Sequence, residues 1–94
     1  MLSVIIPAYN EEKCILHAYE AINSLLTENK IEGEFIFIDD GSKDKTYETI
    51  SALSKEKDNV TGLHFSRNFG KESAISAGLA SVKGDCAVVI DCDL

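Results

Sequence analysis

Apolar residues gather in four short runs along the chain, and longer stretches with a different spacing separate them. Each run has the length of a β-strand and is rich in β-branched or aromatic residues. The runs are SVIIP at 3–7, EFIFID at 34–39, VTGLHF at 60–65 and CAVVID at 86–91. Their apolar positions are nearly continuous, which is typical of strands in a parallel sheet that is covered on both faces.

The stretches between these runs carry apolar residues every three or four positions, which predicts three amphipathic helices. The first helix is expected to begin after Asn10, a good N-cap residue. Glu11 and Glu12 would then stand in its first turn, where the helix dipole favours anions. Its apolar stripe consists of Ile15, Tyr19, Ile22 and Leu26, flanked by Ala18 and Leu25.

The second and third helices are predicted over residues 44–57, with Asp44 as N-cap, and over residues 70–82. Their inward-facing residues are expected to be Tyr47, Ile50 and Leu53 in the second helix and Ile75, Leu79 and Val82 in the third. Gly78 has no side chain and would let the third helix approach the sheet closely.

Strand and helix alternate along the whole chain, which indicates β-α-β units with parallel strands and right-handed crossovers. The predicted fold class is α/β, a Rossmann-like three-layer α/β/α arrangement around a four-stranded, mainly parallel sheet. Ninety-four residues suit one domain, so residues 1–94 are expected to form a single unit.

The most polar segments follow the four predicted strands. In open α/β sheets, ligands bind outside the carboxyl ends of the strands, so these segments are expected to share one site. They are PAYNE at 7–11, DDGSKD at 39–44, SRNFGK at 66–71 and DCDL at 91–94.

Charge and composition narrow the class of protein. A formal net charge of −7 argues against a general nucleic-acid-binding surface, which needs a basic stripe. The chain has no basic leader and no stretch near the ~20 apolar residues that span a bilayer, so a soluble, cytoplasmic segment is expected. Cys14, Cys86 and Cys92 lack metal-ligand spacing and are expected to be reduced thiols, with Cys86 packed as a small hydrophobic residue.

Two adjacent acids, Asp39 and Asp40, end the second predicted strand. The residues after them are explained by a turn, in which Gly41 is permissive and Ser42 and Asp44 cap the next helix. A turn does not explain the acid pair, because two adjacent carboxylates repel each other unless a binding partner offsets the repulsion. A carboxylate here could accept a hydrogen bond from a nucleotide base or a ribose hydroxyl.

Asp91 and Asp93 lie two positions apart, so an extended chain would place both carboxylates on the same side. Such a pair suits Mg²⁺ or Mn²⁺, with substrate phosphates filling the remaining positions. A solvated strand end explains the same two residues without a ligand, and both interpretations stay open at this point.

The other two segments offer a basic group and an aromatic group. Arg67 and Lys71 flank a predicted helix start and suit an anionic diphosphate, although ordinary surface charge would explain either residue alone. Pro7 and Glu11 flank Tyr9, whose ring could face a base or ribose or could equally pack at the edge of the core.

Together these segments resemble the N-terminal half of a family 2 glycosyltransferase with the GT-A fold. The matching stretches are VIIPAYNEE at 4–12, FIDDGSKDKT at 37–46, SRNFGKESAISAGL at 66–79 and GDCAVVIDCDL at 84–94. The third is most similar to the branch that transfers sugars to polyprenyl phosphates, such as dolichol-phosphate mannose synthase and bactoprenol glucosyltransferases. The resemblance implies that the chain ends just after the DxD motif of a longer domain.

The resemblance also implies roles for particular residues. Nucleotide-sugar binding is implied for Pro7, Tyr9, Glu11, Asp39, Asp40, Arg67, Lys71 and Asp91, and metal binding for Asp91 and Asp93. The implied cofactor is Mg²⁺ or Mn²⁺, the donor a nucleotide-diphospho-sugar, and the acceptor of this branch a polyprenyl phosphate. Cys92 departs from the alanine that is frequent in the DxD motif.

Chemically, the resemblance implies inverting transfer, with the metal stabilising the diphosphate as it leaves. No general base is expected within the chain, because the acceptor half of this family lies beyond the DxD motif. His17, on a helix, and His64, inside a strand, are poor candidates. Two alternatives remain: a haloacid-dehalogenase-type phosphatase that uses Asp91 and Asp93, and a non-catalytic nucleotide-binding domain.

We further expect weak or no catalysis from these 94 residues alone, because the acceptor half would lie beyond them. An uncovered sheet edge would favour self-association. Membrane contact is expected through segments outside the chain, which would place the longer protein at the cytoplasmic face of the inner membrane.

Overall fold

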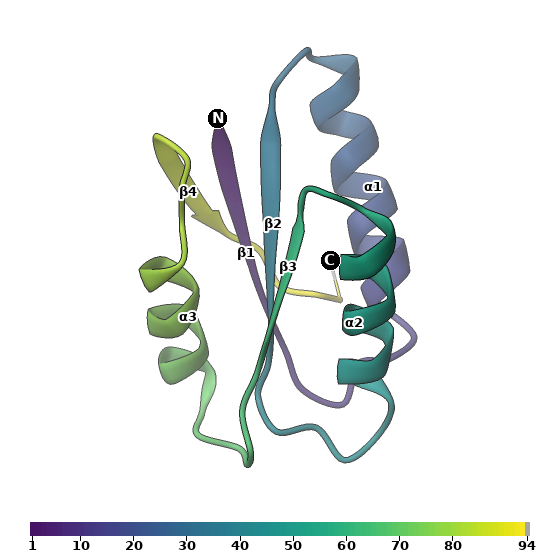
Figure 1. Cartoon of the computed structure of the whole chain (residues 1–94), viewed down its shortest axis with the longest axis vertical. Coiled ribbons are helices and arrows are strands. Elements are labelled where there is room, and N and C mark those ends of the chain that lie inside the picture. The colour runs from purple at the N-terminus through teal and green to yellow at the C-terminus, as the bar shows by residue number, and fades with distance from the viewer. Residues whose placement is uncertain (94) are drawn as a thin grey trace.

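Seven elements alternate between strand and helix in the computed structural model, which describes residues 1–93. They are β1 (Leu2–Ala8), α1 (Ile15–Glu28), β2 (Gly33–Asp39), α2 (Thr46–Glu56), β3 (Val60–His64), α3 (Lys71–Ala80) and β4 (Cys86–Val89). The strands form one sheet in the order β3-β2-β1-β4, and every neighbouring pair is parallel (Figure 1). The α/β class and the parallel sheet predicted from the sequence are confirmed.

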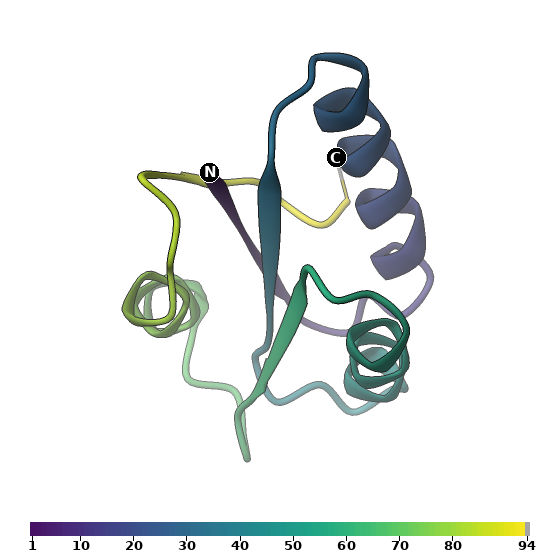
Figure 2. The same cartoon turned by 45° about the horizontal axis from the view of Figure 1, so that its top comes forward.

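The sheet has a helical layer on each side. α1 and α2 cover one face and α3 covers the other, as the two views in Figures 1 and 2 show. Successive residues of the two central strands point to opposite faces, so Phe35 and Phe37 face α1 and α2 while Ile36 and Ile38 face α3. Both strands are therefore apolar at nearly every position.

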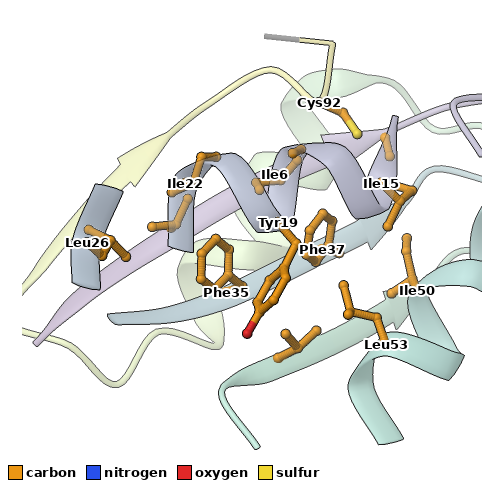
Figure 3. Close-up of a cluster of buried hydrophobic side chains, with 14 residues drawn as sticks. Ile6, Ile15, Tyr19, Ile22, Leu26, Phe35, Phe37, Ile50, Leu53 and Cys92 are labelled. Atoms are coloured by element: carbon orange, nitrogen blue, oxygen red, sulfur yellow. The ribbon is translucent and has the colours of Figure 1, made fainter. Parts of the chain in front are cut away.

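The larger core lies between the sheet and the pair of helices α1 and α2 (Figure 3). Phe35 and Phe37 are fully buried, and the ring of Tyr19 lies 4.8 Å from that of Phe35, centroid to centroid. Burying a side chain of this size stabilises the fold by roughly 1.5–3 kcal/mol. The Tyr19 hydroxyl donates a hydrogen bond of 3.0 Å to Asn59 Oδ1 at the rim, which satisfies its polar end.

The start of α1 differs from the sequence prediction. Cys14, not Asn10, occupies the N-cap position, and no acid stands in the first turn. Asn10 instead has a left-handed backbone with φ of 53°, and its side chain and amide bind the turn that follows β2. The stripe from Ile15 to Leu26 is buried as predicted, whereas Leu25 is exposed.

The start of α2 is closer to the prediction. The helix begins at Thr46, so Lys45 rather than Asp44 occupies the N-cap position, but the Asp44 carboxylate accepts the Thr46 N–H at 2.9 Å. Ile50 and Leu53 are buried, but Tyr47 is half-buried and stacks on the His64 ring with centroids 4.2 Å apart.

The predicted inward face of α3 was wrong for Leu79, whereas Val82, which follows the helix, does pack against the core on this side of the sheet. Ala74 and Gly78 are its buried residues, Leu79 is exposed, and Ile75 and Val82 are only partly buried. Small residues face the sheet because the helix lies very close to it. A Cβ atom at Gly78 would lie 2.7 Å from Ile5 Cγ2, so the predicted role of Gly78 in close packing is consistent with the structure.

Strand β4 is short and exposed. All four of its residues are exposed, and the strand ends at Val89 rather than at Asp91. It lies at the sheet edge beside β1, whereas the helices of the described residues pack on the other three strands. Cys86 is therefore exposed, and the prediction that it packs in the core was wrong; Cys92 is the buried thiol. Self-association through this edge stays a prediction.

Among residues 1–93, no helix combines the length and the apolar character that crossing a membrane requires. The longest helix, α1, has 14 residues.

At the amino end of the sheet, Glu34 ties the α3–β4 turn to β1 and β2. Its carboxylate accepts hydrogen bonds from Ser3 Oγ at 2.5 Å and from the Lys83 N–H at 2.7 Å, and Ser3 Oγ accepts the Gly84 N–H at 3.0 Å. Burial disfavours the ionised form of Glu34, but these hydrogen bonds outweigh burial and lower the pKa of its carboxyl group.

Glu34→Gln is therefore expected to lower the free energy of unfolding by about 2 kcal/mol at neutral pH. Since the pKa is lower in the folded state, the stabilisation is present above about pH 4.5 and is lost as the pH falls through the folded value. Urea unfolding of both proteins at neutral and acidic pH would measure the difference. A gap that stays constant with pH would contradict this assignment.

Candidate functional site

A pocket of about 290 Å³ opens at the carboxyl ends of β1, β2 and β4. It gathers seven of the residues predicted from the sequence, namely Pro7, Tyr9, Glu11, Asp40, Lys71, Asp91 and Asp93. Ala8 and Cys92 complete the lining. Segments that are up to 86 positions apart in the sequence, from Pro7 to Asp93, thus meet at one edge of the sheet.

The acidic side of the pocket is formed by the residues after β4. Asp91 and Asp93 are exposed while Cys92 between them is buried, so both acids lie on the pocket side of the chain, as predicted. Figure 3 shows the Cys92 sulfur directed at the large core, where it anchors this segment. Neither acid belongs to the strand: Asp93 stands in a turn, and Asp91 lies just before it.

Lys71 is the basic group of the pocket. Its Nζ lies 2.5 Å from Asp91 Oδ1, and both side chains are more than half exposed. The hydrogen bond and the charge of Asp91 raise the pKa of Lys71, so the amine stays protonated. An exposed ion pair of this kind contributes little to stability, and its partners can separate at little cost.

The donor set of the pocket suits a hard divalent cation that is shared with a substrate. Among residues 1–93, no group of three His, Cys, Asp or Glu side chains converges into a metal cage. Mg²⁺ and Mn²⁺ do not need one, because one or two carboxylates and substrate phosphates can complete their coordination. Asp91 and Asp93 supply two such carboxylates, and the Cys92 thiol is turned away.

The loop after β1 lies against the turn after β2. The Asn10 N–H donates to Ser42 Oγ at 2.8 Å, the Lys43 N–H donates to Asn10 Oδ1 at 2.8 Å, and the Glu11 N–H donates to Thr46 Oγ1 at 2.9 Å. Sequence reasoning missed this role of Asn10. The available signal was its residue type, because asparagine tolerates the left-handed backbone better than other non-glycine residues do.

Tyr9 and Glu11 belong to the same loop and line the pocket. Tyr9 is 40% exposed, which favours its interpretation as a contact residue over a place at the edge of the core. The Tyr9 N–H donates to Glu11 Oε1 at 3.1 Å, so Glu11 partly orders the loop that carries the ring.

Asp39 does not reach the pocket. It is fully buried, and its two carboxylate oxygens are bonded to His64 Nδ1 at 2.7 Å and to the Ser42 N–H at 3.0 Å. These partners explain why an acid stands beside Asp40 without any ligand. The prediction that Asp39 faces the nucleotide is therefore not supported by its position.

Arg67 also lies outside the pocket lining. Its guanidinium carbon stands 4.7 Å from the centroid of the Phe69 ring, and that ring packs edge-on against Phe65. Of the two basic residues predicted near a diphosphate, the structure brings Lys71 to the pocket and Arg67 to an aromatic surface.

The model of the family described as "Glycosyl transferase family 2" matches residues 3–94. The chain belongs to glycosyl transferase family 2. This confirms the family that the four sequence segments resembled, and Asp91, Cys92 and Asp93 stand where that resemblance places the DxD motif.

A curated relative and a solved structure are similar to this chain over nearly its whole length. The bactoprenol glucosyl transferase of Shigella phage SfV is 42% identical over 93 residues, which are 99% of this chain and 30% of that relative. Glucosyl-3-phosphoglycerate synthase from Mycobacterium tuberculosis, solved with UDP, is 30% identical with a TM-score of 0.75, and the match covers 100% of this chain and 34% of that one.

A mannosyltransferase from Pyrobaculum calidifontis, solved with GDP-Man and Mn²⁺, has a TM-score of 0.83 at 24% identity and covers 98% of this chain and 27% of that one. At this identity the likeness concerns the fold, and it confirms that the family 2 chain has the expected GT-A architecture. The chain spans about a third of the length of each of these proteins.

Cys92, the residue between Asp91 and Asp93 in this family 2 chain, is an unreactive thiol. Burial raises the pKa of the Cys92 thiol to about 12, and the nearby charges of Glu11 and Asp93 act in the same direction. The thiol is therefore protonated at neutral pH and competes neither as a nucleophile nor as a soft metal ligand.

Iodoacetamide at about pH 8 is accordingly expected to alkylate exposed Cys86 quickly, partly buried Cys14 more slowly, and Cys92 hardly at all. Mass spectrometry of peptides taken over time would measure the three rates. The same reaction in denaturing urea is the control, in which the rates should become similar. Equal rates for Cys86 and Cys92 in the native chain would contradict the buried position of Cys92.

Proposed function

We propose that this chain is the donor-binding part of a glycosyltransferase that moves a sugar from a nucleotide-diphospho-sugar to an acceptor. The observation that carries the proposal is that the Asp91 and Asp93 carboxylates, a lysine and an exposed tyrosine line the same pocket. Family membership supports sugar transfer, and UDP in the 30% identical synthase supports a nucleoside diphosphate as the bound group. One side of the pocket carries the Tyr9 ring, which suits a nucleoside. The other side carries Lys71, Asp91 and Asp93, which suit a diphosphate and its metal ion.

On the proposed assignment, Tyr9 and Glu11 contact the nucleoside, and Lys71 and the acids lie at the diphosphate. Asp91 and Asp93 would hold Mg²⁺ or Mn²⁺, which supplies positive charge that stabilises the departing diphosphate. Lys71 can exchange Asp91 for a phosphate oxygen, because its ion pair with Asp91 is exposed and easily broken.

The acceptor that we propose is a polyprenyl phosphate, and the stereochemical outcome is inversion. The bactoprenol glucosyl transferases at 42% identity support this acceptor class. A phosphate acceptor is already ionised, so it does not need a general base. This agrees with the positions of the two histidines, since His17 is exposed on α1 and His64 is bonded to buried Asp39.

The acceptor site would lie in the part of the longer protein that these 94 residues do not contain, and its membrane contact would keep this segment at the cytoplasmic face of the inner membrane. The share of each relative that the chain covers, 30% for the phage enzyme, supports this division. The 94-residue chain alone is then expected to bind donor and to transfer no sugar. The phosphatase alternative loses its basis, since the family 2 model covers residues 3–94.

The test is a transfer assay on the full-length protein with Mn²⁺, undecaprenyl phosphate and a panel of radiolabelled donors that includes UDP-glucose and GDP-mannose. We expect label to move into the organic phase with one donor, and the Asp93→Ala protein is the control that should not transfer it. Failure with every donor, together with release of phosphate from a monoester, would overturn the proposal. Transfer by residues 1–94 alone would overturn the proposed division of the two sites.

A further inference from the structure

Asp40 lines the pocket, yet its carboxylate is bonded to the protein rather than open to it. The residue is only 4% exposed. Oδ1 accepts the Phe69 N–H at 2.8 Å, and Oδ2 accepts the Gly70 N–H and Asn68 Nδ2, each at 3.1 Å. Three donors from one short turn therefore engage both oxygens, which is how a carboxylate orders a loop.

A close backbone contact supports the same junction. Gly41 has φ of 72°, and a Cβ atom built there would lie 2.2 Å from the Arg67 carbonyl carbon and 2.5 Å from the Asn68 nitrogen. Asn68 Nδ2 also donates to the Asp40 carbonyl oxygen at 3.3 Å. The turn after β2 is thus seated directly on the backbone of residues 67–70.

This seated turn ends where the pocket lysine begins. Gly70 has a positive φ of 104° and is the N-cap residue of α3, so the next residue, Lys71, is the first of the helix. The Lys71 amine then reaches Asp91 across the pocket at 2.5 Å. Asp40 therefore fixes the backbone one residue before the group that faces the acids.

We propose that Asp40 is a positioning residue for phosphate binding: it holds residues 68–70 so that Lys71 points into the pocket. The inference rests on the proposed function, because it assigns Lys71 to the diphosphate of the donor. Its geometric part, the hold of Asp40 on the turn, can be tested without any ligand.

The first experiment is amide hydrogen exchange on the chain and on Asp40→Asn. Asparagine has the same size as aspartate, but an NH₂ group replaces one of the two carboxylate oxygens. This NH₂ group is a donor, so it cannot accept the N–H hydrogen bonds that the replaced oxygen accepts in Asp40. We expect the Phe69 and Gly70 amides to exchange at least about tenfold faster in the variant, with the β1 and β2 amides unchanged. Unchanged exchange at Phe69 and Gly70 would overturn the proposal even if no nucleotide binds.

The second experiment separates phosphate from nucleoside by titrating the chain with UDP and GDP, and in parallel with uridine and guanosine, followed by NMR. Asp40→Asn and Lys71→Ala are each expected to weaken diphosphate binding by about tenfold and to leave nucleoside binding within about twofold. The double variant should lose no more than either single variant does, because both changes remove the same interaction. Lys55→Ala, which removes an exposed lysine from the end of α2, is the charge-matched control.

Asn68→Ala provides a milder variant in case Asp40→Asn unfolds the chain. It removes the side-chain bonds from Asn68 to Asp40 and keeps the two backbone donors, so a smaller loss confined to the diphosphates is expected. Equal loss of nucleoside and diphosphate in Asp40→Asn would overturn the positioning role and indicate direct contact. Absence of binding by every nucleotide, with faster exchange at Phe69 and Gly70, would instead defeat the proposed function alone.

Discussion

Asp93→Ala is expected to weaken Mn²⁺-dependent binding of UDP or GDP by at least about tenfold, whereas Arg67→Ala should change it by less than about twofold. Asp93 supplies one of the two pocket carboxylates that would hold the cation, and removing it leaves Asp91, which is already paired with Lys71. The Arg67 guanidinium lies over the Phe69 ring and outside the pocket lining. Calorimetry with and without Mn²⁺ would measure both losses.

Comparing nucleotide binding with and without Mn²⁺ tests whether Asp93 acts through the cation. Without Mn²⁺, Asp93→Ala is expected to bind the nucleotide no more weakly than the original chain, because the carboxylate itself repels phosphate. Equal losses for Asp93→Ala and Arg67→Ala would count against the proposed metal site. A loss at Asp93 that is the same in EDTA would show that the residue acts without a cation.

Gly41→Ala should lower the free energy of unfolding by about 3 kcal/mol, the largest stability effect that we expect. Alanine strains a backbone with φ of 72°, and its Cβ would overlap the Arg67 and Asn68 backbone, which cannot move away as the tip of a side chain could. Urea unfolding of the chain and the variant would measure the loss.

Gly70→Ala is the matched control for this substitution. Gly70 also has a positive φ, of 104°, but nothing lies within 4 Å of a Cβ atom built there. With ψ of 157°, Gly70 lies in a region that essentially only glycine adopts, so alanine there should show the backbone cost alone, about 1–3 kcal/mol. A loss at Gly41 that is smaller than the loss at Gly70 would mean that the contact between the turn after β2 and residues 67–68 contributes nothing.

The fold was largely predictable because its strands are buried on both faces. Central β1 and β2 are apolar at almost every position, and such runs separated by helical stripes admit few arrangements other than a parallel sheet. The prediction of buried side chains failed at positions whose burial depends on how closely a helix packs on the sheet. Leu79 is as apolar as Ile50, but α3 packs through Ala74 and Gly78 and leaves Leu79 exposed.

The candidate site divides in the same way. The sequence located the polar segments, and the parallel sheet implied that they meet, which accounts for the seven predicted residues in the pocket. It could not separate Asp39 from Asp40, since adjacent residues of the same type differ only in their partners. The Asp39 carboxylate is hydrogen-bonded to His64 and Ser42, whereas the Asp40 carboxylate is hydrogen-bonded to the backbone within residues 68–70.

The amino-acid sequence by itself determined the family, the alternation of strands and helices, and the edge of the sheet where the polar groups gather, because these follow from local pattern and from the direction of parallel strands. Tertiary structure alone decided which of those groups face the pocket. Lys71 reaches it and Arg67 does not, and Cys92 is buried while Cys86 is exposed. Side-chain direction at a loop depends on hydrogen bonds and packing between segments far apart in the chain, and local sequence does not encode those contacts.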